Sequence, residues 1–300
     1  EVDLGSSSYE YKDLYVDGTA YVDAINFNGT AISATAAELN LLDGATSLAT
    51  SVNSLSDALV EDNSIYIGND PASTTSTAQY NLAVGTTALS AITTGDYNTA
   101  LGYFSLRALT TGSKNTALGS STLSYNTTGS YNLALGMNSL NANTTGTRNI
   151  AIGYDALGSP DTENDNLAIG YEALKGSIAG GEFNVAIGNY SLDALTSGDK
   201  NTGVGYNALT GVTSGSWNTA VGHEAGKAMT TGADNTAFGL SAGAAITTGS
   251  RNIAIGGVAL NDADAENDNL AIGYAALGGA INGGEYNVAI GNYSLDAITS

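Results

Sequence analysis

The sequence predicts an all-β protein, a parallel β-roll or β-solenoid of about fourteen coils with about 17 residues in each. The main observation is a glycine that closes the pattern Asn-x-Ala-x-Gly, with steps of 17 residues except for two steps of 18. An earlier, degenerate copy ends at Gly68, so the repeats run from about residue 63 to the last residue. The repeated glycines are Gly85, Gly102, Gly119, Gly136, Gly153, Gly170, Gly188, Gly205, Gly222, Gly239, Gly256, Gly273 and Gly291.

The second observation is a short apolar strand before each glycine. Asn stands four residues before it in all thirteen clear copies, and Ala stands two before it in every copy except the one with Gly203. The residue directly before it is always apolar, from Val84 to Ile290. Because side chains alternate along a strand, both faces are apolar. We therefore expect a strand buried on both faces, with the inside of the coil on one side and another chain on the other.

The second half of each coil usually has Leu four residues after the glycine, followed by a turn such as Thr110-Thr111-Gly112. We expect a coil made of strand, tight bend, short strand and turn, in which the turn glycine supplies a positive φ. Seventeen residues are too few for a four-stranded propeller blade or a helix pair. Coils stacked about 4.8 Å apart would give a rod of roughly 65 Å.

The Asn of each coil is predicted to have a structural role. Stacked amides can hydrogen-bond along the stack, and Asn tolerates the left-handed backbone of a corner. The residue before each Asn is often aromatic or charged, as in Tyr80, Lys114 and Trp217. This variability predicts exposed side chains that stack between coils, and contact with a receptor is the alternative.

Residues 1–62 differ from the repeats. Two segments alternate around Asp17-Gly18 and Asn28-Gly29, which predicts β-hairpins. A coiled-coil pattern follows, formed by Leu41, Ala45, Leu48, Val52, Leu55 and Leu59. We therefore divide the chain into an N-terminal β-hairpin stem at residues 1–35, a short helical or coiled-coil connector at 36–62 and a repetitive β-roll at 63–300. The helix is expected from about Ala45 to Leu59 and would align several chains in parallel.

Composition argues against several classes of function. The chain has 29 acidic and 8 basic residues and a net charge of −21, which disfavours nucleic acid and anionic membranes as partners. It has no cysteine and no apolar run of about 18 residues, so neither disulfides nor a membrane span are predicted. His223, the one histidine, occupies a coil position that elsewhere holds Tyr. We predict no enzyme activity, no catalytic or cofactor-binding residue and no metal site.

Two acidic segments leave calcium as an alternative. Residues 161–165 and 262–268 place oxygen-bearing side chains at alternate positions, as Asp161, Glu163 and Asp165 show. They lack the glycine and the terminal bidentate Glu of an EF-hand loop. The pattern therefore favours solvated acidic turns over Ca²⁺ sites.

The sequence also contains a repeat that is longer than one coil. The segment Asp161–Ser197 matches Asp264–Ser300 almost residue for residue, which indicates duplication of a block of six coils. The extra residue of the two longer steps falls in both copies, near Ala179-Gly180-Gly181 and Asn282-Gly283-Gly284. We predict an inherited bulge at these turns, and we expect the full chain to continue beyond Ser300 with a segment like that from Gly198 onward.

The chain resembles two families of fibrous proteins. The segment Leu-Gly-Ser-Ser-Ser-Tyr-Glu-Tyr-Lys-Asp-Leu-Tyr-Val-Asp-Gly-Thr-Ala-Tyr at residues 4–21, with Ala-Glu-Leu-Asn-Leu-Leu-Asp-Gly at 37–44, resembles the stem of tail-fibre and other fibrous structural proteins of marine tailed phages. The Asn-Thr-Ala-x-Gly-x-x-Ala-Leu coils, which are common in such proteins, are also similar to the head repeats of trimeric autotransporter adhesins, although those coils are usually shorter. Adhesin heads are trimers of left-handed parallel β-rolls. The resemblance implies a parallel homotrimer.

These observations lead to three expected functions. The first is a structural fibre of a virion, such as a phage tail fibre, that spaces or presents a host-binding tip at the virion surface. The alternative is a bacterial extracellular adhesin or surface filament, and the third is an ice-binding solenoid, suggested by the recurrent Thr. The expected partners are other copies of the chain, and then a host-surface receptor or a neighbouring virion or filament protein.

Overall fold

The computed structural model describes residues 26–27, 30–31, 58–61, 63–68, 71, 77–279, 281 and 283–296. The chain divides into two units, residues 1–48 and residues 49–300. In the first unit, β1 (Asn26–Phe27) pairs antiparallel with β2 (Thr30–Ala31), as expected around Asn28-Gly29. The hairpin expected around Asp17-Gly18 lies outside the described residues, and the stem as a whole stays a prediction.

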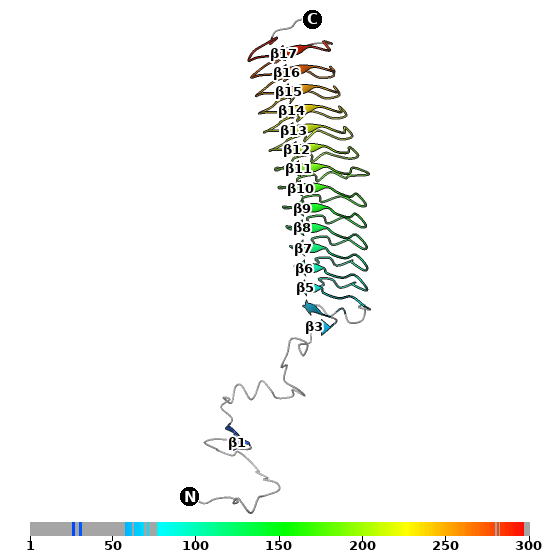
Figure 1. The fold of residues 1–300 in the computed structure, drawn as a ribbon. Coiled ribbons are helices and arrows are strands. Elements are labelled where there is room, and N and C mark those ends of the chain that lie inside the picture. Colours follow the sequence, from blue (N-terminus) through cyan, green and yellow to red (C-terminus); the bar gives the residue numbers. More distant parts are fainter. Residues whose placement is uncertain are drawn as a thin grey trace, which may run out of the picture. The chain divides into compact units, whose positions relative to one another are not determined.

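The second unit is a β-solenoid, which confirms the predicted fold class. One sheet contains fifteen strands in the order of the sequence, and the coils stack one above the next (Figure 1). Its first two strands, β3 (Ala58–Glu61) and β4 (Ser64–Ile67), are antiparallel, and every later pairing is parallel. The other strands are β5 (Leu82–Val84), β6 (Thr99–Leu101), β7 (Thr116–Leu118), β8 (Leu133–Leu135), β9 (Ile150–Ile152), β10 (Leu167–Ile169), β11 (Val185–Ile187), β12 (Thr202–Val204), β13 (Thr219–Val221), β14 (Thr236–Phe238), β15 (Ile253–Ile255), β16 (Leu270–Ile272) and β17 (Val288–Ile290).

The start of the sheet corrects the predicted helix. Ala58 and Leu59 lie in β3, so a helix does not reach Leu59, while residues 45–57 lie outside the described residues. The sheet thus begins at residue 58, before the predicted boundary at 63. β3 pairs with β4 along its full length and covers an edge of the sheet that would otherwise be open.

Equivalent residues of successive coils form straight columns. Ala151, for example, pairs with Ala168, and Ile152 pairs with Ile169. We call the residues from Ala83 to Ala289 the inner Ala column, including Gly203, and those from Asn81 to Asn287 the Asn column. Because the register never slips between parallel neighbours, each column has the same environment along the whole roll.

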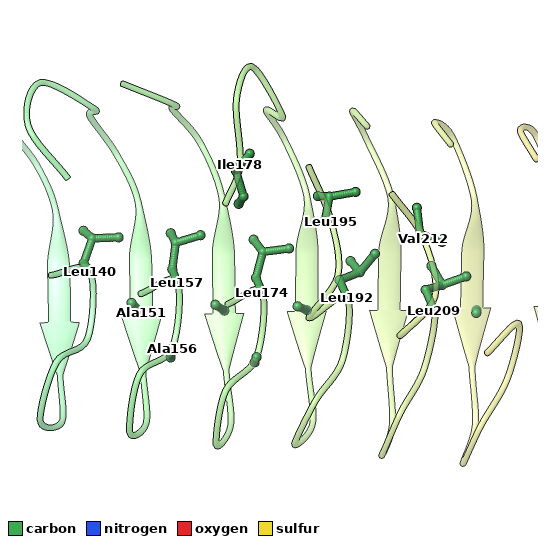
Figure 2. Close-up of a cluster of buried hydrophobic side chains, with 14 of the residues drawn as sticks. Leu140, Ala151, Ala156, Leu157, Leu174, Ile178, Leu192, Leu195, Leu209 and Val212 are labelled. Carbon is green, nitrogen blue, oxygen red and sulfur yellow. The ribbon is translucent and has the colours of Figure 1, made fainter. Parts of the chain in front are cut away.

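The core is narrow and lies inside the coils. Behind the inner Ala column stand two rows of larger side chains (Figure 2). Ala151 and Leu157 are fully buried, as are most of their equivalents. The first row includes Leu140, Leu157, Leu174, Leu192 and Leu209, and the second includes Ile178, Leu195 and Val212. From β5 to β17 the strand side holds only Ala or Gly203, because the facing wall of each coil supplies the bulky residue, whereas β4 at the start of the sheet places the buried Tyr66 in register with Ala83.

The repeated glycine is required for two reasons. Gly119 has a φ of 134°, a conformation that residues with a side chain rarely adopt. A Cβ at this position would also lie 2.8 Å from the carbonyl carbon and oxygen of Gly136 in the next coil. The glycine therefore allows both the bend after the strand and the close stacking of the coils.

The Thr-Gly turns differ from the prediction. Neither Gly112 nor Gly129 has the expected positive φ. A Cβ on Gly112 would instead lie inside the contact distance of the Gly129 carbonyl oxygen. The glycine is needed at this turn because the next coil passes close to it, so the sequence pattern was right and its assigned reason was wrong.

The return half of each coil is also not the short strand that was predicted. Phe104 and Leu106 both have left-handed backbones, with φ of 61° and 49°. These alternate residues prevent an extended strand, although the Leu106 N–H still donates a hydrogen bond of 3.0 Å to the Thr122 carbonyl in the next coil. In two coils the Leu position holds Gly226 or Gly243, with φ of 60° and 57°.

The Asn column forms the predicted ladder. The N–H of Asn115 donates to Asn98 Oδ1 at 3.0 Å, and Asn115 Nδ2 donates to Asn98 Oδ1 at 3.1 Å and to the Gly129 carbonyl at 2.9 Å. Each buried amide thereby joins two coils and also closes its own coil. The left-handed corner residue is the one before the Asn, as Lys114 with a φ of 60° shows. The prediction that Asn itself takes this backbone is wrong, because Asn points inward to its partners.

Candidate interaction surface

The roll presents one flat outer face, which is the side of the sheet away from the core. Leu82 and Val84 are each 37% exposed, whereas Ala83 between them is 1% exposed. We call the residues directly before and after the inner Ala column the two outer strand columns. We call the residues that follow the repeated glycine the edge column, and those that precede the Asn column the corner column. Alternation places the two outer strand columns on this face, and the corner and edge columns flank it at the two ends of each strand, next to the left-handed corner and the glycine bend.

The two outer strand columns contain no charged residue in any of the thirteen strands β5 to β17. Their members are aliphatic residues and Thr, with the single aromatic Phe238. The single chain therefore does not bury this face, although the sequence predicted burial on both sides of the strand. A continuous apolar surface on a folded chain usually marks an interaction site.

The edge column carries aromatic rings that contact each other between coils. Tyr154 stacks on Tyr171 with ring centroids 5.1 Å apart, and Tyr206 stacks on His223 at 5.2 Å. His223 is exposed and takes the position of a Tyr, as the sequence predicted. Because these rings stack face to face within the chain, a partner would contact mainly their edges.

The corner column is exposed and paired between coils, as predicted. Tyr80 stacks on Tyr97 at 4.7 Å, and the Lys200 ammonium lies 5.3 Å from the centroid of the Trp217 ring. Two ion pairs continue the column, Arg148–Asp165 at 2.6 Å and Arg251–Asp268 at 2.7 Å. The hydrogen bond from Arg148 holds the pKa of Asp165 below its ordinary value.

The return side of the coils has a different character. Lys175 lies 3.1 Å from both Asp155 and Glu172, and Lys227 lies 2.7 Å from Glu224. These residues form local ion pairs typical of a solvated surface. The outer face has an apolar centre between an aromatic edge column and a mixed aromatic and charged corner column, which is the arrangement of a protein–protein interface.

The acidic turns are occupied by internal hydrogen bonds. Glu163 accepts from the N–H groups of Asp161 at 2.8 Å, Thr162 at 3.0 Å and Gly180 at 2.9 Å. Glu266 repeats this arrangement with Asp264, Ala265 and Gly283. Gly180 and Gly283 belong to the predicted bulges. The bulged turn thus provides an N–H group that donates to the Glu carboxylate of the preceding coil. Glu163 and Glu266 occupy the coil position that is glycine in most other coils.

The acidic side chains of these turns are directed to partners other than a Ca²⁺ ion. Glu163 faces backbone N–H groups, and Asp165 pairs with Arg148. Within the residues that the structure describes, no group of three or more His, Cys, Asp or Glu side chains comes together as metal ligands would.

Glu266 leads to a prediction about pH. Burial raises the pKa of its carboxyl, but the backbone hydrogen bonds from Gly283, Asp264 and Ala265 outweigh burial, so the pKa lies below its ordinary value. A lowered folded-state pKa stabilises the fold above the unfolded pKa of about 4.3, and this contribution disappears as the pH falls through the folded value. We expect Glu266→Gln to lose about 1 kcal/mol at pH 7 and much less at pH 3. Urea midpoints at the two pH values measure this, and an equal loss at both would contradict it.

The recurrent Thr residues have a structural role. The hydroxyls of Thr93, Thr110 and Thr127 donate to the carbonyl of the equivalent residue in the next coil, at 2.9, 3.0 and 3.0 Å. These hydrogen bonds join coils across the turn. They give a structural role to the first Thr of each Thr-Thr-Gly turn, part of the pattern that suggested ice binding.

Comparison with protein-family models, curated proteins and solved structures gives no significant match to this chain. Across the described residues there is no helix with the length and hydropathy needed to cross a membrane.

Proposed function

We propose that this chain is a segment of a structural fibre in which copies associate in parallel, as a homotrimer, through the outer face of the roll. The observation that carries the proposal is the uncharged pair of outer strand columns, whose residues are half-buried or exposed in all thirteen consecutive strands. A monomer that left this surface in water would have a strong tendency to associate.

Another copy of the chain is the partner that fits best, because the surface is periodic. Thirteen coils at about 4.8 Å make a face roughly 60 Å long, and each three-residue strand spans about 10 Å across it. The strands alone therefore offer roughly 600 Å², and the corner and edge columns that flank them bring the face toward the ~800 Å² per partner of a typical stable interface. A second roll repeats with the same spacing, so it can make the same contact at every coil.

The fibre is proposed to belong to a virion, as a tail fibre or related appendage that spaces or presents a host-binding tip. A continuous stack of similar coils supports such a role, because the parallel ladder joins every neighbouring pair of coils and so holds the two ends of the stack apart. The stem-like segments at residues 4–21 and 37–44 favour a phage fibre over a bacterial surface filament, and the trimeric number follows from the same resemblance.

Association is tested by adding charge to the outer face. We expect Ile152→Asp with Ile255→Asp to weaken association at least about tenfold, because each buried unpaired carboxylate costs several kcal/mol. Thr111→Asp with Ser214→Asp is the matched control, since these exposed turn residues add the same charge away from the face. Sedimentation equilibrium measures the change, and a wild-type chain that stays a folded monomer at micromolar concentration would contradict the proposal.

The virion role is tested on particles. Gold-labelled antibodies against residues 63–300 are expected to decorate a fibre on virus particles from the same source. Labelling of the surface of bacterial cells that carry no particles would instead support the adhesin alternative.

A further inference from the structure

The duplicated six-coil blocks make the outer face repeat on a larger scale. Equivalent residues of the two blocks are the same at most positions of the outer strand columns or differ by one methylene. The identical pairs are Thr99 and Thr202, Thr116 and Thr219, Ile150 and Ile253, Ile152 and Ile255, Leu167 and Leu270, Ile169 and Ile272, Val185 and Val288, and Ile187 and Ile290. Two copies staggered by six coils would therefore still place like residues together along the seven coils that overlap, so the side chains of the repeating face specify register weakly.

One row breaks this repetition. The second block has Thr236, Phe238 and Leu240 where the first has Leu133, Leu135 and Met137. Phe238 and Leu240 are 56% and 57% exposed, compared with 37% for Ile255 in the next coil. Phe238 and Leu240 are therefore more exposed than the aliphatic residues of the next coil.

The next coil adds a second difference. In the edge column, Gly257 replaces the equivalent Tyr154 of the first block. Tyr154 places a ring against Tyr171, whereas Gly257 has no side chain and the nearest atom to a Cβ there would be the Tyr274 ring at 3.4 Å. The second block thus combines the more exposed Phe238 and Leu240 with an edge column that lacks a ring in the next coil, whereas the first block has Leu135, Met137 and the ring of Tyr154.

We infer that the row of Thr236, Phe238 and Leu240, together with Gly257, selects the aligned register when copies of this chain associate. The inference rests on the proposed self-association. In the aligned register these rows meet each other where both copies have Gly257 and lack the edge-column ring. In the six-coil stagger, Phe238 and Leu240 face the row of Leu135 beside the ring of Tyr154. Crowding of the wrong alignment is a common source of specificity.

The experiment uses engineered cysteines, because the chain has none. Chains with Thr116→Cys are mixed with chains with Thr219→Cys, refolded together and linked with a short bis-maleimide, and the linked peptides are identified by mass spectrometry. We expect links between equal positions, 116 to 116 and 219 to 219, and almost none from 116 to 219. Cysteines at Thr111 and Ser214, on the exposed turn, are the background control.

The decisive variant copies the first block into the second, with Thr236→Leu, Phe238→Leu, Leu240→Met and Gly257→Tyr. The new residues already occupy the equivalent coil positions of the first block, so the roll should fold, which circular dichroism verifies. We expect the 116-to-219 links to rise about tenfold. Val204→Leu with Val221→Leu, which also makes the blocks more alike but leaves the row of Thr236, Phe238 and Leu240, should not change them.

Three outcomes oppose the inference, and they are distinguishable. Strong 116-to-219 links in the wild-type chain, or links that the four-residue variant does not increase, would overturn the register role while association stands. A wild-type chain that remains monomeric would overturn both the register role and the proposed fibre.

Discussion

Replacing Gly119 with alanine is expected to destabilise the roll by about 3–5 kcal/mol. The backbone there has a φ of 134°, and the added Cβ would lie 2.8 Å from the Gly136 carbonyl group. Since that neighbour is backbone and stands in the next coil, no side-chain rotation can relieve the contact. Urea unfolding followed by circular dichroism measures the loss.

Gly257→Ala is the matched control for this substitution. Gly257 does not have the left-handed φ, and its nearest neighbour is the side chain of Tyr274 at 3.4 Å. We expect a change within about 0.5 kcal/mol, as for an ordinary surface substitution. Equal effects at the two glycines would show that stacking of the repeated glycines is not what the roll requires.

Replacing Ala151 with aspartate is expected to unfold several coils or the whole roll. Ala151 is fully buried in the inner Ala column, and an unpaired carboxylate there costs several kcal/mol. The same holds for Ala134. The sequence alone predicts that a charge at either position disrupts either the roll or the contact between chains. Because the column points into the core, we expect loss of the roll itself. Circular dichroism at low protein concentration measures this as loss of the β-sheet signal.

Ile152→Asp separates the two effects, because Ile152 is the next residue on the same strand and faces outward. We expect it to leave the β-sheet signal of the single chain unchanged and to weaken only association. If Ala151→Asp kept the fold while Ile152→Asp lost it, the assignment of inner and outer faces would be wrong.

The repeats explain why much of the architecture was predictable from the sequence. The Asn, Ala and Gly positions recur in coil after coil, so the strand, its register and the Asn ladder follow from the spacing. The corner column was predicted to be exposed and stacked because its residues vary, and Tyr80 on Tyr97 shows this. The apolar outer strand columns, which form the proposed interface, were also evident from the alternation.

Other features follow from how the coils close and stack, which the spacing of the repeats does not encode. Only the structure places Gly112 against a carbonyl of the next coil. Only the structure shows that Lys114 and Leu106 have the left-handed backbone. Likewise, only the structure brings the Gly180 N–H to the Glu163 carboxylate in the preceding coil. The sequence by itself therefore determined the coil, its length and its two apolar faces. The tertiary structure decided which face is inside, because from β5 to β17 the closure of each coil on its own Leu and Asn residues leaves no room there for a side chain larger than that of alanine.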